Sequence, residues 1–242
     1  MILYFSGTGN TKYIAKYLAD HLHDECVDMS EYTKEKKHLV VSSDKPFVIA
    51  SPIYAWRLPL FIEDLLKDAK LEGNDHVYGV VTRESESGNA EKYLKDIIEK
   101  DGKQFMGMFC VNMPNQYLLA GEVASKEETS ELDAIVNVIK SGVTVNESHH
   151  SVSGAVKSGV VNTAFNKFMV SSKRFKVSDD CIGCGKCARG CPVGNITMKD
   201  GHPVFGDHCT WCFYCMQHCP KSAIDYGNST KGKPRNVCPE YK

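Results

Sequence analysis

Eight of the eleven cysteines lie in one short part of the chain and repeat a single spacing twice. The two copies, residues 181–192 and 209–220, both have the pattern C-x2-C-x2-C-x3-C-P. Three thiolates on one tight loop can reach three corners of an iron–sulfur cube, and they leave its fourth corner open. Each proline fixes φ and supplies no N–H, which helps to turn the chain away from the preceding sulfur ligand. The spacing therefore predicts iron–sulfur chemistry.

This part of the chain resembles the two-4Fe-4S bacterial ferredoxins over residues 175–227. In that pattern the fourth cysteine of each repeat closes the cluster of the other repeat, so the resemblance implies two crossed ligand sets. The first set is Cys181, Cys184, Cys187 and Cys219. The second set is Cys209, Cys212, Cys215 and Cys191. The crossing makes the two repeats one folding unit.

The two repeats differ in the residues between their cysteines. The corresponding pairs are Gly183 and Trp211, Gly185 and Phe213, and Lys186 and Tyr214. We therefore expect the second cluster to have a more aromatic surround, with this side turned toward the preceding domain.

Two other uses of cysteine fit this spacing less well. Structural zinc sites use two separated pairs and need neither a third cysteine nor a Cys-Pro step. Disulfides need an oxidising compartment, whereas the first eleven residues lack the basic leader of a signal peptide. We therefore expect a reducing, cytoplasmic setting, and a zinc-binding interaction module is kept as an alternative.

A second polar stretch lies near the beginning of the chain. Residues 2–5 predict a buried strand, and apolar residues recur at helical spacing over residues 13–22. Between them is the loop Ser6-Gly7-Thr8-Gly9-Asn10-Thr11. Backbone N–H groups of such a loop and of the helix start favour a phosphate, and the hydroxyl groups add donors. The loop is neither a Walker loop nor G-x-G-x-x-G, and a plain helix N-cap turn is the alternative.

This loop resembles the FMN phosphate loop of flavodoxins, which has the pattern T/S-x-T-G-x-T and also follows the first strand. The resemblance implies phosphate contacts from Ser6, Thr8, Gly9, Asn10 and Thr11. It also implies two loops at the isoalloxazine ring, after the strands at 47–50 and 77–82. The contacts expected in these loops are Pro52, Ile53, Tyr54, Ala55, Trp56, Thr82, Arg83 and Gly88.

An aromatic side chain is suited to cover one face of the flavin, because stacked rings exclude water. Tyr54 and Trp56 are the candidates for this contact, and packing of both into the core is the alternative. The loop after residue 82 is acidic and contains only one glycine, Gly88, which distinguishes it from the glycine-rich or aromatic versions of this loop.

Short strands alternate with helices over the first 145 residues. The expected strands are 2–5, 25–28, 47–50, 77–82 and 105–111, and the expected helices include 60–70, 91–100 and 126–140. This alternation predicts an α/β fold, a flavodoxin-like doubly wound parallel sheet of five strands. Ligands bind such sheets at the carboxyl ends of the strands, near the switch point. All the proposed flavin loops, and a further loop at 113–117, follow strands.

Composition and charge divide the chain further. Hydrophobic residues make up 42% and charged residues 24%, which is ordinary for a globular protein, and no stretch of 18 apolar residues predicts a membrane span. Residues 1–150 carry 16 Lys and Arg against 24 Asp and Glu, and residues 151–242 carry 13 against 6. Because thiolate-bound clusters are negative, we interpret the basic excess as partial neutralisation and expect no nucleic-acid partner.

These features predict four regions. Residues 1–145 form the FMN domain, 146–174 a linker with an interdomain helix, and 175–230 a small α+β two-cluster domain. Residues 231–242 form a basic tail that contains Cys238, which we interpret as a structural or incidental thiol.

The whole chain resembles the flavodoxin–ferredoxin fusion proteins of anaerobic metabolism. The resemblance implies FMN, two 4Fe-4S clusters and electron transfer between them. We expect a soluble electron carrier that exchanges electrons with redox partner proteins and has no catalytic residue. The alternative is an FMN-dependent reductase of a quinone, a nitro compound or another small acceptor, for which Arg57 and Tyr117 are the first side chains to examine.

Overall fold

The computed structural model describes residues 1–113, 128–145, 151–235 and 237–238. Its first part is a five-stranded sheet with the order β2-β1-β4-β6-β7, in which every pair of neighbours is parallel. The strands are β1 (Ile2–Tyr4), β2 (Cys26–Asp28), β4 (Phe47–Pro52), β6 (His76–Arg83) and β7 (Gln104–Asn112). This is the doubly wound order of flavodoxin-like sheets, and all five strands predicted from the sequence are in it.

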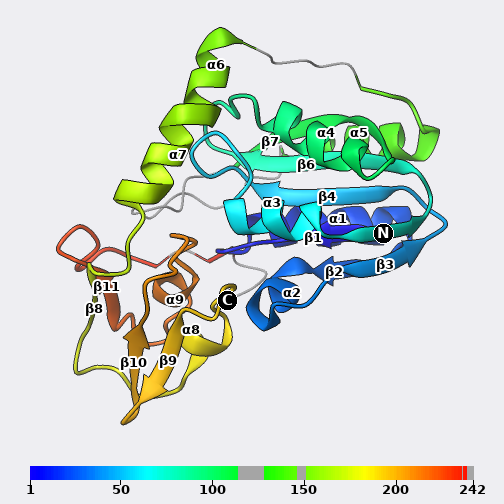
Figure 1. Cartoon of the computed structure of the whole chain (residues 1–242). Helices are drawn as coiled ribbons and strands as arrows, with labels where there is room; N and C mark the ends of the chain where they lie inside the picture. The colour runs from blue at the N-terminus through cyan, green and yellow to red at the C-terminus, as the bar shows by residue number, and fades with distance from the viewer. Residues whose placement is uncertain (114–127, 146–150, 236, 239–242) are drawn as a thin grey trace.

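Helices cover both faces of this sheet (Figure 1). On one face α1 (Asn10–Leu22) and α5 (Glu128–Ser141) bury Ile14, Leu18 and Ile135 against the strands. On the other face lie α2 (Met29–Glu35), α3 (Leu60–Lys67) and α4 (Ala90–Lys100). The two apolar layers fix the sheet and therefore the loops at its carboxyl edge.

Two short strands were not predicted from the sequence. β3 (Val40–Ser43) and β5 (Lys70–Gly73) form a separate parallel pair, so the helix expected over 60–70 ends at Lys67. Val40 is 51% exposed, which weakens the apolar pattern by which a strand is recognised. The helix expected over 126–140 is described from residue 128, and residues 114–117 of the expected loop lie outside the described residues.

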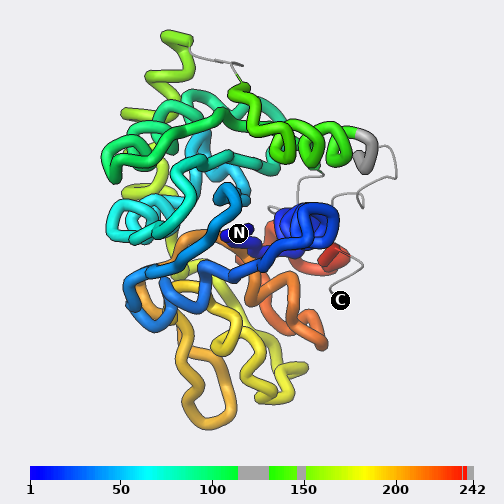
Figure 2. The backbone as a smooth tube through the Cα atoms, turned by 90° about the vertical axis from the view of Figure 1, so that its right-hand side faces the viewer, coloured from blue at the N-terminus to red at the C-terminus, as the bar shows by residue number. Residues whose placement is uncertain are grey.

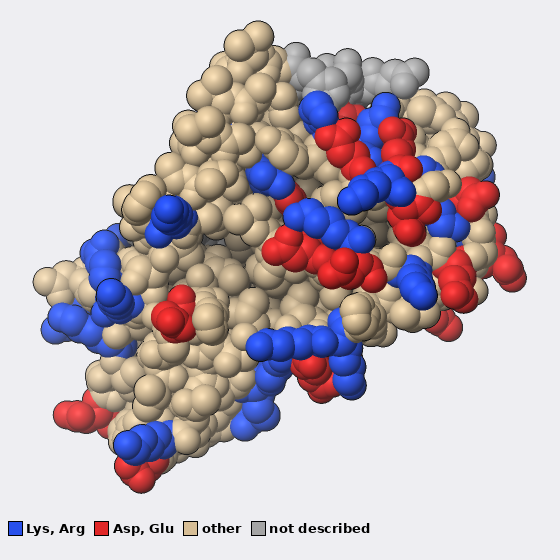
Figure 3. Space-filling model, viewed as in Figure 1, with Lys and Arg blue, Asp and Glu red and all other residues tan. Residues whose placement is uncertain are grey.

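A long helix joins the two parts of the chain. It consists of α6 (Val152–Val156), η1 (Lys157–Val161), α7 (Asn162–Ala164) and η2 (Phe165–Met169), and we call residues 152–169 the interdomain helix. The apolar residues of 160–170 predict only a short helix in this linker, whereas the observed helix begins eight residues earlier. Figure 3 shows a largely uncharged surface over α6 and α7.

The carboxyl-terminal part is small and lies below the sheet in both Figure 1 and Figure 2. It contains two antiparallel pairs, β8 (Phe175–Val177) with β11 (Ile224–Tyr226), and β9 (Ile196–Lys199) with β10 (His202–Phe205). It also contains two single-turn helices, α8 (Lys186–Arg189) and α9 (Tyr214–Gln217). Each of them includes the third cysteine of one repeat. No helix among the described residues is long and apolar enough to cross a membrane.

Candidate cofactor site at the domain junction

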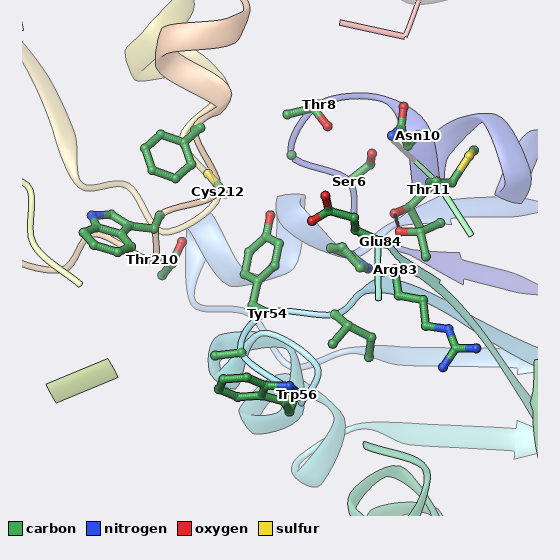
Figure 4. Close-up of a pocket in the computed structure, with 18 of the residues that line it drawn as sticks. Ser6, Thr8, Asn10, Thr11, Tyr54, Trp56, Arg83, Glu84, Thr210 and Cys212 are labelled. Atoms are coloured by element: carbon green, nitrogen blue, oxygen red, sulfur yellow. Dashed lines mark hydrogen bonds between the residues drawn. The ribbon is translucent and has the colours of Figure 1, made fainter. Parts of the chain in front are cut away.

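A cavity of about 380 Å³ lies where the loops after β1, β4 and β6 meet (Figure 4). This volume falls in the range of small-molecule and cofactor pockets, near its lower end. The cavity is lined by all the predicted flavin contacts except Gly9 and Gly88. The structure therefore brings three separate sequence segments together at one edge of the sheet.

The loop after β1 is shaped to receive an anion. Gly9 has φ 107 and precedes α1, whose start has no side-chain cap and no acidic residue in its first turn. The Gly9 N–H donates to Ser6 Oγ at 3.0 Å, and Thr11 Oγ1 lies 2.9 Å from Thr82 Oγ1. The helix start and the hydroxyl groups thus border the same cavity, as a phosphate site requires.

The loop after β4 closes into a tight turn. Tyr54 N–H donates to Arg57 O at 2.8 Å, and Arg57 N–H donates to Tyr54 O at 3.3 Å. The two residues between them, Ala55 and Trp56, have φ of 48° and 65°, in the left-handed region that non-glycine residues rarely adopt. We call residues 54–57 the flavin turn. Both Tyr54 and Trp56 line the cavity.

Arg57 does not line the cavity. Its guanidinium forms a two-point ion pair with the buried Glu63 of α3 and lies 3.7 Å from the centre of the Tyr93 ring. Burial raises the pKa of Glu63, and the Arg57 charge opposes this shift. Arg57 therefore holds the flavin turn to α3 and α4. It is one of the two side chains to examine first for a reductase, and it is engaged away from the cavity. Tyr117 lies outside the described residues.

The loop after β6 contributes other residues than expected. Glu84, Ser85 and Glu86 line the cavity with Arg83, whereas Gly88 does not. A Cβ on Gly88 would lie 2.5 Å from Ser158 Oγ and 2.7 Å from Trp56 Cβ, and its φ is 59°. Gly88 thus permits close packing behind the flavin turn.

The remaining wall of the cavity comes from the other part of the chain. It consists of Thr210, Trp211, Cys212 and Phe213, together with Phe165, Asn166 and Val170 at the end of the interdomain helix. The expectation that the aromatic side of the second repeat faces the preceding domain is borne out by Trp211 and Phe213. The threonine and the interdomain-helix residues gave no signal in the sequence, because they reach the cavity only through domain packing.

Cysteines of each predicted ligand set lie near one another. Cys181, Cys184, Cys187 and Cys219 line one small pocket. In the other set, the charges of Cys191, Cys209 and Cys212 all act on Cys215. Burial raises the pKa of Cys212 to about 12 and that of Cys215 well above its usual range. Such thiols ionise when a metal centre coordinates them, so this set fits a buried cluster.

The two sets stand at different distances from the cavity. A Cβ on Gly7 would lie only 2.5 Å from the Cys212 carbonyl oxygen, so the second set adjoins the phosphate loop. In the first set Cys184 is exposed, and its neighbour Ile182 is 60% exposed. We call the second set the proximal set and the first set the distal set.

Further contacts hold the carboxyl-terminal part against the phosphate loop and against α2. The backbone of Gly7 hydrogen-bonds His218, and Cys238 N–H donates to Thr8 O at 3.0 Å. Thr33 Oγ1 donates to Pro192 O at 2.6 Å. Cys238 is buried, and its backbone N–H holds the carboxyl-terminal end of the described chain to the phosphate loop.

Comparisons with known proteins agree with this division. Residues 1–115 match the family model described as flavodoxin domain, and residues 173–220 match the model described as 4Fe-4S dicluster domain. The chain joins a flavodoxin domain to a 4Fe-4S dicluster domain. The first domain implies FMN and the second iron–sulfur clusters, so the zinc alternative is set aside.

Three curated relatives are each similar to part of this chain. Pyruvate synthase subunit PorD of Methanothermobacter marburgensis is 38% identical over 52 residues, 22% of this chain and 62% of that protein. Polyferredoxin protein MvhB of Methanothermus fervidus is 35% identical over 22% of this chain and 13% of that protein. An uncharacterized polyferredoxin-like protein of Methanocaldococcus jannaschii is 27% identical over 47% of this chain and 76% of that protein.

This chain spans less than two thirds of the length of the first two relatives. Among solved structures, two-electron reduced Megasphaera elsdenii flavodoxin is 18% identical, with a TM-score of 0.32 over 46% of this chain and 85% of that chain. The two domains together support a role in electron transfer.

Proposed function

We propose that this protein is an electron carrier in which FMN, in the junction cavity, exchanges electrons with a proximal 4Fe-4S cluster. That cluster in turn exchanges them with a distal 4Fe-4S cluster. The predicted flavin contacts and the two predicted cysteine sets would hold these groups. The observation that carries the proposal is that Cys212, a member of the proximal set, itself lines the cavity.

The chemistry of the two kinds of centre suits this arrangement. FMN can hold one or two electrons, whereas each cluster exchanges one. A flavin beside the proximal set and an exposed distal set would match a two-electron donor to one-electron partners. The exposed Cys184 makes the distal set the natural contact for external redox proteins.

The shape of the cavity favours a carrier over a reductase. Its volume of about 380 Å³ suits one cofactor-sized molecule, and Trp211 and Phe213 are among the residues that line it. A reductase would need additional open space above the flavin for its acceptor. Among the described residues, no observation favours the reductase, since Arg57 is engaged with Glu63.

Cysteine use supports a reducing, cytoplasmic setting for this carrier, because thiols that ligate clusters must escape oxidation to disulfides. The partners are proposed to be redox proteins, and their identity is open to direct capture in the reduced state.

Anaerobic reduction of the purified protein tests the proposal. Flavin is followed by absorbance, and the clusters by paramagnetic resonance, with iron, acid-labile sulfide and FMN measured on the same sample. We expect both clusters and the flavin to take up electrons and to equilibrate within one molecule. Clusters that turn over with an external reductant while bound flavin stays oxidised would overturn internal transfer.

A further inference from the structure

The interdomain helix buries two polar residues and leaves most of its large apolar residues exposed. Ser158 and Asn162 are 0% and 1% exposed, whereas Val152 and Val160 are 86% and 76% exposed. Ordinary surface helices show the reverse pattern, because apolar burial is what fixes them to a domain. The buried polar residues of this helix must therefore meet polar groups of the flavodoxin domain.

Those groups are the carbonyl oxygens of the flavin turn. Ser158 Oγ donates to Trp56 O at 2.8 Å. Asn162 Nδ2 donates to Ala55 O at 2.8 Å and to Tyr54 O at 3.3 Å. Three consecutive carbonyls of the turn thus accept hydrogen bonds from two side chains of one helix.

Ser158 also reaches the second flavin loop. Its Oγ accepts from the Asn89 N–H at 2.8 Å, and the Gly88 backbone packs against it. One hydroxyl group therefore connects the end of the β6 loop to the flavin turn. Neither Ser158 nor Asn162 lines the cavity, so neither side chain is placed to touch FMN itself.

The turn needs this support because of its backbone conformation. Ala55 and Trp56 are both left-handed, a backbone conformation that strains residues with a Cβ. Strained backbone of this kind persists where the surrounding structure determines it. Hydrogen bonds from a buried amide and a buried hydroxyl to the turn carbonyls supply that determination.

We propose that Ser158 and Asn162 are positioning residues that hold the flavin turn in its left-handed conformation, and that the interdomain helix thereby couples this turn to the proximal-set loop. The coupling continues at the other end of the helix. The Phe165 ring lies edge-on to Trp211, with centroids 5.6 Å apart, and the Trp211 indole N–H donates to Ser171 O at 2.8 Å. This inference rests on FMN binding in the junction cavity, as in the proposed function.

The variant Asn162→Ala, in the full cluster-loaded protein, tests the inference. Removal of the amide takes away the side-chain donor to the Ala55 carbonyl and leaves the Tyr54 carbonyl with the Arg57 N–H alone, so we expect FMN affinity to fall roughly tenfold. The visible circular dichroism of bound flavin should change, while iron content and cluster signals stay as in the parent protein. Ser158→Ala should act in the same direction.

Thr163→Ala is the matched control. Thr163 is exposed on the same helix, and its Oγ1 donates to the helix's own Gly159 O at 2.9 Å. Its removal tests the stability of the helix without touching the flavin turn, and we expect FMN affinity within about twofold of the parent protein. A tenfold loss in this variant as well would overturn a specific role for Asn162.

A second substitution separates positioning from general stability. Glycine adopts φ near 48° without strain. A double variant that adds Ala55→Gly to Asn162→Ala should therefore regain most of the FMN affinity that Asn162→Ala loses. Parent-like FMN binding by Asn162→Ala alone would overturn the inference, and so would a loss that Ala55→Gly leaves unchanged. Failure of electron transfer in a parent protein that binds FMN would instead count against the proposed function.

Discussion

The two cysteine repeats have the same backbone and opposite surroundings. Gly183 and Gly185 in the first repeat have φ of 65° and 69°, and the residues 28 positions later, Trp211 and Phe213, both have φ of 54°. Glycine adopts this left-handed conformation without strain, whereas tryptophan and phenylalanine do not. The cluster loop therefore requires a left-handed backbone at these positions whatever the residue type. The bulky side chains of the second repeat need a separate explanation.

That explanation is visible in the packing. Trp211 and Phe213 are only 7% and 3% exposed, and both rings contact Tyr226 edge-on. They form part of the cavity wall as well. In the first repeat, a Cβ on Gly183 would lie 2.9 Å from Gly201 O. The second repeat thus forms part of the domain interface, whereas the first repeat is an exposed loop.

The largest expected effect comes from removing one cluster ligand of each repeat. Cys212→Ala should abolish the proximal cluster and about half of the iron, because the crossed sets share no ligand. Cys184→Ala should remove about the same amount of iron from the distal site. Iron analysis and paramagnetic resonance measure both. If either variant loses all cluster signals, the repeats cannot hold metal separately and the comparison between two independent sites fails.

The next effect concerns the aromatic wall. Trp211→Gly relieves a left-handed residue but removes a large buried ring, and packing outweighs strain. We expect the free energy of unfolding to fall by about 2 to 4 kcal/mol and FMN to bind more weakly. Denaturant titration and flavin fluorescence measure the two quantities. Unchanged stability would show that the ring is not what holds this loop to the flavodoxin domain.

The corresponding change in the first repeat should act differently. Gly183→Ala places a Cβ against Gly201 O at a left-handed position, so we expect a loss of about 1 to 2 kcal/mol in unfolding free energy. FMN affinity should not change, because this loop does not line the cavity. Weaker FMN binding in this variant would mean that the two repeats are not separated in function as the structure indicates.

A third pair of positions gives the smallest effect. Gly194 and Ser222 are also 28 residues apart, with φ of 62° and 50°. Ser222 is exposed, so its side chain gains little from packing at this position. Ser222→Gly should stabilise the protein by up to about 1 kcal/mol in denaturant titration. A destabilisation would show that Ser222 contributes a contact that the backbone comparison does not include.

The sequence predicted the elements that depend on local pattern. Apolar runs such as residues 47–50 and 77–82 identified all five sheet strands, and parallel topology then brought the loops that follow them to one edge. The cysteine spacing likewise predicted both groups of thiols. These features need only neighbouring residues and general rules of topology.

The remaining features depend on contacts between distant segments. Nothing local distinguishes Asn162 as a donor to Ala55, or assigns Thr210 to a flavin cavity, because both contacts follow from how the domains pack. The left-handed flavin turn was also missed, since Ala55 and Trp56 are not residues that favour positive φ. Gly88 was predicted as a flavin contact because it is the single glycine of its loop, but it packs behind the turn instead of lining the cavity.

The most direct test of the account compares internal electron transfer in the two cysteine variants. FMN bound to each protein is reduced by a light pulse under anaerobic conditions, and its reoxidation by the remaining cluster is followed by absorbance. We expect rapid reoxidation in Cys184→Ala, which keeps the proximal cluster. In Cys212→Ala the centre adjoining the flavin is missing, so we expect the reoxidation rate to fall by about a hundredfold or more. Equal rates in the two variants, each with half of its iron retained, would contradict a path from FMN through the proximal cluster.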